Sequence, residues 1–213
     1  MKTEEWVSLL ATGVDPVDRR GTLRRGALMF TAGVLVALLF TLGILHANPR
    51  MLSYLSNVAF WIREVYCAAL GAVGLLAVSR LARPGRRLGP LPAALAVPVV
   101  AMWGLAVAAL LTAPPALRRH LILGNTASVC SLLITFISVP LFVAFIGILR
   151  EFAPTRLRLA GAAAGFAAGS LGALIYSLHC PELAPPFIGL WYLLGMLIPA
   201  ALGAGLGPRL MRW

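Results

Sequence analysis

Six apolar runs dominate this chain and limit what it can fold into. Each is close to the length of about 20 residues that a helix needs to cross the hydrocarbon core of a bilayer. In lipid, only helices or closed barrels pair all backbone N–H and C=O groups. The runs show no period-two alternation, which favours helices. We therefore predict six transmembrane helices, at roughly residues 26–46, 58–79, 91–112, 128–149, 158–178 and 187–207.

The composition also predicts an all-α integral membrane protein. Of the 213 residues, 60% are hydrophobic and 12% are charged, whereas soluble domains are about 25% charged. The formal net charge of +11 could suggest nucleic acid as a partner. The basic residues, however, lie in short clusters between the apolar runs, and no soluble segment is long enough to form a nucleic-acid-binding module. We therefore expect no direct contact with nucleic acid.

The distribution of Lys and Arg predicts the orientation of the chain, because short cytoplasmic loops carry an excess of these residues. Loops 47–57, 113–127 and 179–186 hold three of them, Arg50, Arg118 and Arg119. The opposite set of segments holds Lys2, Arg19, Arg20, Arg24, Arg25, Arg80, Arg83, Arg86, Arg87, Arg150, Arg156, Arg158, Arg209 and Arg212. We expect both termini to be cytoplasmic and the three sparse loops to face outward.

Residues 1–25 form a cytoplasmic N-terminal segment, and residues 26–213 form the six-helix transmembrane domain. In the first segment, apolar residues recur at helical spacing, which predicts a short amphipathic helix that Gly13 and Pro16 end. Such a helix could lie on the membrane surface. The acids at its start favour a protein partner instead, because an anionic inner leaflet would repel them. The candidate binding residues are Glu4, Glu5, Trp6, Leu9 and Leu10, with Val14 and Val17 continuing the apolar stripe.

The fifth run contains Gly161, Gly165 and Gly169, which recur every four residues on one helix face. Glycines at this spacing let two helix backbones approach closely in a membrane. We therefore predict that this face packs against another helix.

All three histidines and two of the three cysteines fall in one thin layer on the outer side: His46, His120, His179, Cys130 and Cys180. The fourth and fifth runs are joined by a short turn, so they are expected to be antiparallel neighbours. Cys130 and Cys180 could then meet and form a disulfide or part of a metal site. The alternative is that the cysteines pack as small apolar residues. We interpret Cys67, in the middle of the second run, in that way.

Few features point to catalysis or transport. No ionisable residue lies at the middle of an apolar run, whereas an ion-coupled transporter needs such groups. The sequence also lacks a phosphate-binding loop and an HExxH zinc motif, and we expect no enzyme. Arg63 and Glu64 adjoin Trp61, an interfacial anchor, and we interpret them as mutually paired or snorkelling.

Several segments resemble a known family along essentially the whole chain. They include FWIREVYCAALG at 60–71, LARPG at 81–85, CSLLITFISVP at 130–140, LHCPE at 178–182 and the ending GPRLMRW. The sequence is similar to the negative-regulator-of-sigma-F (NrsF) family of six-helix anti-sigma factors of the bacterial inner membrane. The resemblance implies that the N-terminus helps to bind an extracytoplasmic-function (ECF) sigma factor. It also implies that Cys130 and Cys180 sense oxidative or heavy-metal stress.

The resulting hypothesis is a membrane anti-sigma factor that releases its sigma factor when the outer thiols change state. It needs no resident cofactor, although a transition-metal ion is a candidate signal. The candidate metal ligands are His179, Cys180, Cys130, His46 and His120. The alternatives are a transporter of a small solute or metal ion, a thiol or haem redox protein, and a scaffold whose cysteines only pack. Surrounding lipid is expected, and homo-oligomers are left open.

Overall fold

The computed structural model describes residues 3–12 and 19–212, and the side chains of Leu10, Ala11 and Arg19 are outside this description. The described residues form helices without strands. Six helices are long and apolar enough to cross a membrane, as the sequence predicted. They are α2 (Arg19–Phe40, continued by the π-helical turn η1, Thr41–Leu45), α4 (Val58–Leu81), α5 (Leu91–Thr112), α7 (Ala127–Glu151), α8 (Leu157–Tyr176) and α10 (Leu193–Leu210). The short elements are α1 (Thr3–Ala11), α3 (Met51–Tyr54), α6 (Pro115–Leu123), α9 (Pro185–Phe187) and the π-helical turn η2 (Ile188–Tyr192).

The helices match the predicted runs closely, except at the start of the first. The helix α2 begins at Arg19, seven residues before the predicted start at residue 26. Arginine is a good helix former, so the helix continues past the point where apolar sequence ends. The predicted boundary between an N-terminal segment and the transmembrane domain therefore falls inside α2.

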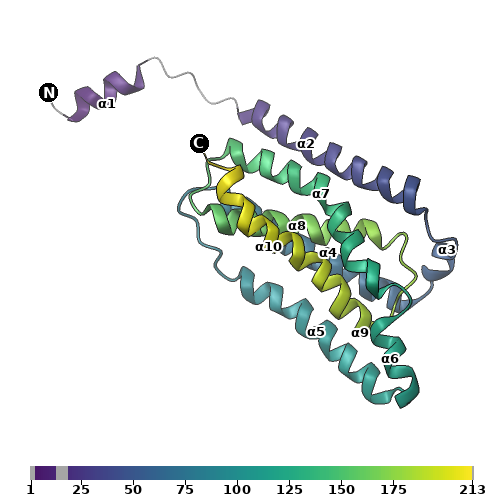
Figure 1. Ribbon diagram of the computed structural model, residues 1–213. Helices are drawn as coiled ribbons and strands as arrows, with labels where there is room; N and C mark the ends of the chain where they lie inside the picture. The colour runs from purple at the N-terminus through teal and green to yellow at the C-terminus, as the bar shows by residue number, and fades with distance from the viewer. Residues whose placement is uncertain (1–2, 13–18, 213) are drawn as a thin grey trace.

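The helix α8 lies at the centre of the bundle (Figure 1). It packs against α10, α4 and α7, and 78% of its most apolar window is buried, compared with 11% for α5. An apolar helix that is hardly buried by protein is one that faces lipid in a membrane. The helix α8 and the faces of α4, α7 and α10 that pack on it therefore form the protein core, and α5 lies at its edge.

The closest helix packing joins α8 to α10 along glycines. A methyl group on Gly161 would overlap the carbonyl oxygen of Gly203, and one on Gly165 would overlap that of Pro199. A methyl group on Gly169 would lie 2.8 Å from the Cα atom of Met196. The three glycines of the fifth run thus face the backbone of α10, and any side chain there would separate the two helices.

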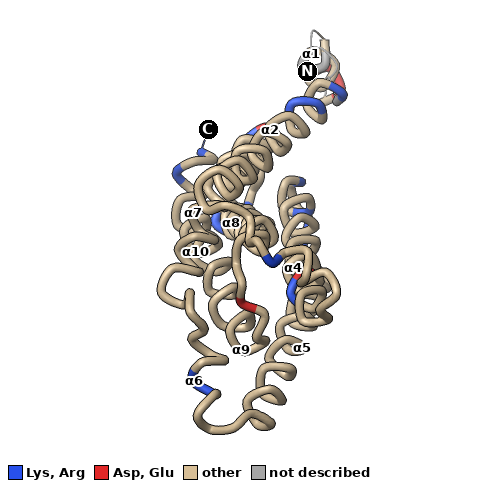
Figure 2. Tube along the Cα trace, turned by 90° about the vertical axis from the view of Figure 1, so that its right-hand side faces the viewer, with Lys and Arg blue, Asp and Glu red and all other residues tan. Residues whose placement is uncertain are grey.

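The charged residues are distributed unevenly along the bundle. Figure 2 shows Lys and Arg gathered around the start of α2 and the C-terminus, with a smaller group on α6. We call the first region the basic end. The opposite end of the bundle carries Cys130 and Cys180, and we call it the cysteine end. The long helices run between the two ends, so they are the physical connection between any event at one end and any response at the other.

Candidate functional site

The two thiols at the cysteine end lie in contact. Cys130 is in the first turn of α7, and Cys180 is in the turn that follows α8. Both side chains are fully buried in the same core cluster, and the two thiols are close enough for each to act on the ionisation of the other. Neither cysteine is in a disulfide. Two neighbouring thiols can form a disulfide once their sulfur atoms come to about 2.05 Å from each other.

Arg63 of α4 holds the turn that carries Cys180. Its Nη1 donates to the carbonyl oxygens of Cys180 and Glu182, each at 3.0 Å, and its Nη2 donates to that of Ser177 at 3.1 Å. These carbonyls belong to the turn after α8, where the helix no longer supplies them with N–H partners. Arg63 is fully buried. The sequence-based interpretation of Arg63 as a snorkelling side chain is therefore wrong, because its guanidinium points into the protein.

Glu64 completes this polar cluster. Its carboxylate accepts from Arg63 Nε at 3.1 Å and from the Ser177 hydroxyl at 3.0 Å. The predicted pairing of Arg63 with Glu64 is thus confirmed. A buried charge is tolerated when it is paired and fully hydrogen-bonded. Four hydrogen bonds therefore join helix α4 to the turn after α8, and the Arg63–Glu64 pair within α4 keeps this network neutral.

Neighbouring loops tie the same turn from other sides. The carbonyl oxygen of Leu178 accepts from the N–H of Asn48, and His179 Nδ1 lies 2.9 Å from the carbonyl oxygen of His46. On the α6–α7 side, the carboxylate of Glu182 accepts from the N–H of Asn125 at 2.7 Å. The turn from Ser177 to Glu182, which we call the Cys180 turn, is therefore connected to the loops before α3 and after α6, as well as to α4.

The absence of a side chain at Gly124 leaves room for the carboxylate of Glu182. Gly124 has a φ of +51°, and a methyl group there would lie 2.6 Å from the Glu182 carboxyl carbon. We predict that Gly124→Ala lowers the free energy of unfolding by roughly 1–3 kcal/mol, because φ +51° with ψ −152° is a backbone conformation that is essentially restricted to glycine. Thermal unfolding followed by circular dichroism in detergent measures this. Gly205→Ala is the matched control, because beyond its own stretch of helix no atom of the described residues lies within 4 Å of the added methyl. Equal effects of the two changes would contradict the prediction.

The surroundings of Cys180 favour its thiolate. The pKa of Cys180 is lowered to about 6, chiefly by the neighbouring Cys130 thiol and against the opposing effect of burial, with smaller contributions from the Tyr192 hydroxyl, the N–H of Glu182 and the charge of Arg63. The Tyr192 hydroxyl lies beside the sulfur without reaching a conventional hydrogen bond. A thiolate is the reactive form of cysteine in oxidation and in metal binding. The pair therefore combines a nucleophilic sulfur with a second thiol ready to react with its oxidised form.

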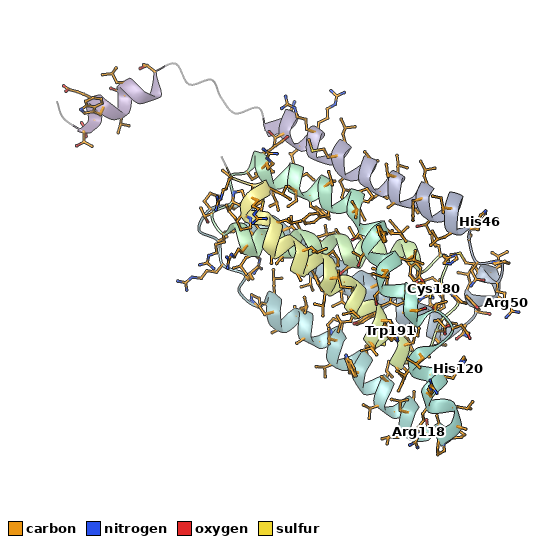
Figure 3. All side chains as sticks on the ribbon, in the orientation of Figure 1. His46, Arg50, Arg118, His120, Cys180 and Trp191 are labelled. Carbon is orange, nitrogen blue, oxygen red and sulfur yellow. The ribbon has the colours of Figure 1, made fainter. Side chains whose placement is uncertain are left out.

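The five candidate metal ligands do not come together as one site. His120 is exposed on α6, and the ring of His179 contacts the backbone of His46 instead of a cysteine. Figure 3 shows His46, His120 and Cys180 toward the same end of the bundle. Among the described residues, no three His, Cys, Asp or Glu side chains are placed to hold one ion. The two thiols alone remain as a candidate pair of soft ligands.

The N-terminal candidates lie on α1, apart from the bundle (Figure 1). Trp6 and Leu9 are 54% and 61% exposed, and Glu4 and Glu5 stand in the first turn of the helix. The side chain of Leu10, together with Val14 and Val17, lies outside the described residues. The described part of the stripe therefore presents large apolar side chains next to carboxylates, as a docking segment does.

Sequence reasoning missed the role of Arg63 and Glu182 in building the site. Both residues stood in quoted motifs, FWIREVY and LHCPE. The one available signal was the energetic cost of placing charged side chains at a membrane boundary, where they need partners. Their partners come from segments 57 to 119 residues away along the chain.

Comparisons with known proteins agree over the full length. A family model described as "NrsF: Negative regulator of sigma F" matches residues 10–213. A "Probable anti-sigma-F factor NrsF" of Azospira oryzae is 45% identical over 213 residues, covering 100% of both chains. An "Anti-sigma-F factor NrsF" of Caulobacter vibrioides is 36% identical over 216 residues, again covering 100% of both. No solved structure matches. The resemblance seen in the motifs is thus confirmed, and the chain belongs to the NrsF family of negative regulators of sigma F.

Proposed function

We propose that this protein is a membrane anti-sigma factor that holds an ECF-type sigma factor and releases it when Cys130 and Cys180 are oxidised. The names of the two full-length relatives support the anti-sigma role. The observation that carries the sensing role is the buried contact between the two thiols, at the end of the bundle opposite the basic residues. The protein works without enzymatic turnover, because release of a bound partner is its output.

The orientation follows from the excess of Lys and Arg at the basic end. With that end in the cytoplasm of a bacterial inner membrane, the sigma factor and α1 share one compartment. The cysteine end then faces the periplasm, which is an oxidising compartment where disulfides persist. The signal and the response are therefore on opposite sides of the membrane.

The sigma factor is proposed to dock on α1. Exposed aromatic and aliphatic side chains flanked by acids suit a partner with an apolar groove and a basic rim. Trp6 is the expected anchor, since Trp is enriched among residues that dominate binding energy. The basic-end loops 80–90 and 150–158 and the C-terminus extend this surface.

The signal is proposed to be a two-electron oxidant such as a hydroperoxide. Each thiol gives up its proton, the two sulfur atoms lose two electrons in total and form one S–S bond, and the peroxide is reduced to water and an alcohol or a second water. The disulfide fixes α7 relative to the Cys180 turn. Because α8 leads from this turn to the basic end and is tightly packed on α10, a shift at the turn can reach the cytoplasmic surface. A ligand shifts such an equilibrium only if the two states bind it differently.

The test is a pull-down of sigma factors by the detergent-solubilised protein. We expect the wild type to capture a sigma factor and a chain lacking residues 2–16 to lose it. Trp6→Ala with Leu9→Ala should lose most of the capture, because these residues form the exposed apolar stripe. Ser8→Ala, on the opposite face of α1 by helical spacing, is the matched control and should capture normally. Full capture by the truncated chain would contradict docking on α1, and no capture by the wild type would contradict the anti-sigma role.

A further inference from the structure

Arg63 is the most unusual residue of the bundle. It is an arginine within a membrane-spanning helix, and its side chain has no exposed surface. It makes four hydrogen bonds, one to Glu64 and three to carbonyls of the Cys180 turn. Well-packed apolar residues usually stabilise a protein at least as well as a buried ion pair. Stability alone therefore does not explain why a charge stands at this position.

The three carbonyl groups that accept hydrogen bonds from Arg63 lie before, at and after Cys180 along the chain. They belong to Ser177, to Cys180 itself and to Glu182. Arg63 thus holds the backbone before, at and after Cys180, whose thiol neighbours that of Cys130 on α7. A planar guanidinium can hold several acceptors in this fixed arrangement, whereas a lysine ammonium cannot.

We infer that Arg63 is the positioning residue of the thiol pair: it fixes the Cys180 turn so that the Cys180 sulfur is the one that attacks an oxidant, with Cys130 placed to resolve the product. The inference deepens the proposed function and rests on it. It assigns unequal roles to the two cysteines, which neither the sequence nor the relatives' names distinguish.

The charge of Arg63 supports the same assignment. The titratable and charged groups near Cys180 are Arg63, Glu64 and Cys67 on α4, Tyr176 on α8, His179 and Glu182 in the turn, Cys130 on α7 and Tyr192 on η2. Arg63 is the cation among them with a permanent charge. A nearby guanidinium favours a thiolate over a thiol. Cys180, whose backbone Arg63 holds, therefore gains more from this charge than Cys130 does.

The chemistry then has a defined order. The Cys180 thiolate attacks one oxygen of a hydroperoxide, the O–O bond breaks, and the leaving oxygen takes up a proton. The sulfenic acid on Cys180 next reacts with the Cys130 thiol, forming the S–S bond and releasing water. Two electrons pass from the sulfur atoms to the peroxide. Because both thiols are fully buried, the oxidant must be small, so hydrogen peroxide fits and a protein disulfide does not.

The test measures thiol chemistry on the purified full chain, without a sigma factor. Disulfide formation by hydrogen peroxide is followed at pH values on either side of 6, by mass spectrometry after quenching. The wild-type rate should fall as the pH is lowered, with a midpoint below the ordinary pKa of a cysteine, because the pKa of Cys180 is lowered and only its thiolate reacts. Arg63→Gln should move this midpoint upward and slow the reaction below it by about tenfold per pKa unit. Arg63→Lys keeps the charge, so it should keep the midpoint but react more slowly, because the turn is no longer held.

Arg50→Gln is the matched control, since Arg50 is exposed at the same end of the bundle, and it should react like the wild type. Wild-type rates and midpoints in folded Arg63→Gln and Arg63→Lys would overturn the inference. A second measurement keeps the inference testable if neither variant folds. With Arg63 intact, hydrogen peroxide should convert Cys180 in Cys130→Ala to its sulfenic acid more than it converts Cys130 in Cys180→Ala, as scored by a sulfenic acid trap added together with denaturant. The opposite preference would overturn the assignment. If the wild type forms no disulfide at all, the proposed sensing function fails instead.

Discussion

Cys180→Ala should capture its sigma factor as the wild type does and keep it when hydrogen peroxide is added. The variant lacks one of the two sulfur atoms that the disulfide needs, so the oxidised state cannot form. Cys130→Ala should behave in the same way. The measurement is the fraction of sigma factor that hydrogen peroxide elutes from the immobilised membrane protein. We expect elution from the wild type and none above background from either variant.

Cys67→Ala is the matched control for this result. Cys67 is also fully buried, but it lies on α4 and outside the contact between Cys130 and Cys180. The Cys67→Ala change removes one buried thiol but leaves both Cys130 and Cys180 available to form the disulfide. Peroxide should therefore release the sigma factor from Cys67→Ala normally. Release from Cys180→Ala at the wild-type level would reduce both cysteines to packing residues and leave the anti-sigma role intact.

Gly165→Ala should destabilise the bundle strongly. The added methyl would overlap the carbonyl oxygen of Pro199, which belongs to a helix backbone and cannot rotate away. Overpacking in a close-packed interior costs typically about 1–3 kcal/mol, and more where backbones must separate. Thermal unfolding in detergent, followed by circular dichroism at helical wavelengths, should show a clear fall in the midpoint relative to the wild type.

Gly104→Ala provides the comparison on another helix. Gly104 lies on α5, and in the part of the chain that the structure describes, no atom outside its own stretch of helix is within 4 Å of a methyl placed there. Alanine is also the better helix former by about 1 kcal/mol. The unfolding midpoint should therefore stay the same or rise. A fall as large as that of Gly165→Ala would mean that helix propensity, and not the contact between α8 and α10, governs the effect.

The sequence alone determined the architecture of this protein. A bilayer requires about 20 apolar residues per crossing and permits little besides helices, so six such runs lead directly to six long helices. The same reasoning predicted that the fourth and fifth helices, which Cys130 begins and Cys180 follows, are neighbours, because a short turn joins them. The glycines of the fifth run were likewise recognised as a packing face, since their spacing places them on one side of a helix. The family, too, could be recognised from motifs in the sequence, and the comparisons confirmed it.

Only the tertiary structure decided which residues hold the thiols in place. Hydropathy gives the length and depth of a helix but not its rotation about its own axis, so Arg63 could equally have pointed to the membrane surface. Its acceptors are backbone carbonyls at the end of α8, between 114 and 119 residues away along the chain. Every residue carries such a carbonyl, so no sequence pattern marks the three that α8 leaves unpaired. Packing α4 against α8 placed the guanidinium beside these three acceptors and made Cys180 the fixed sulfur of the pair.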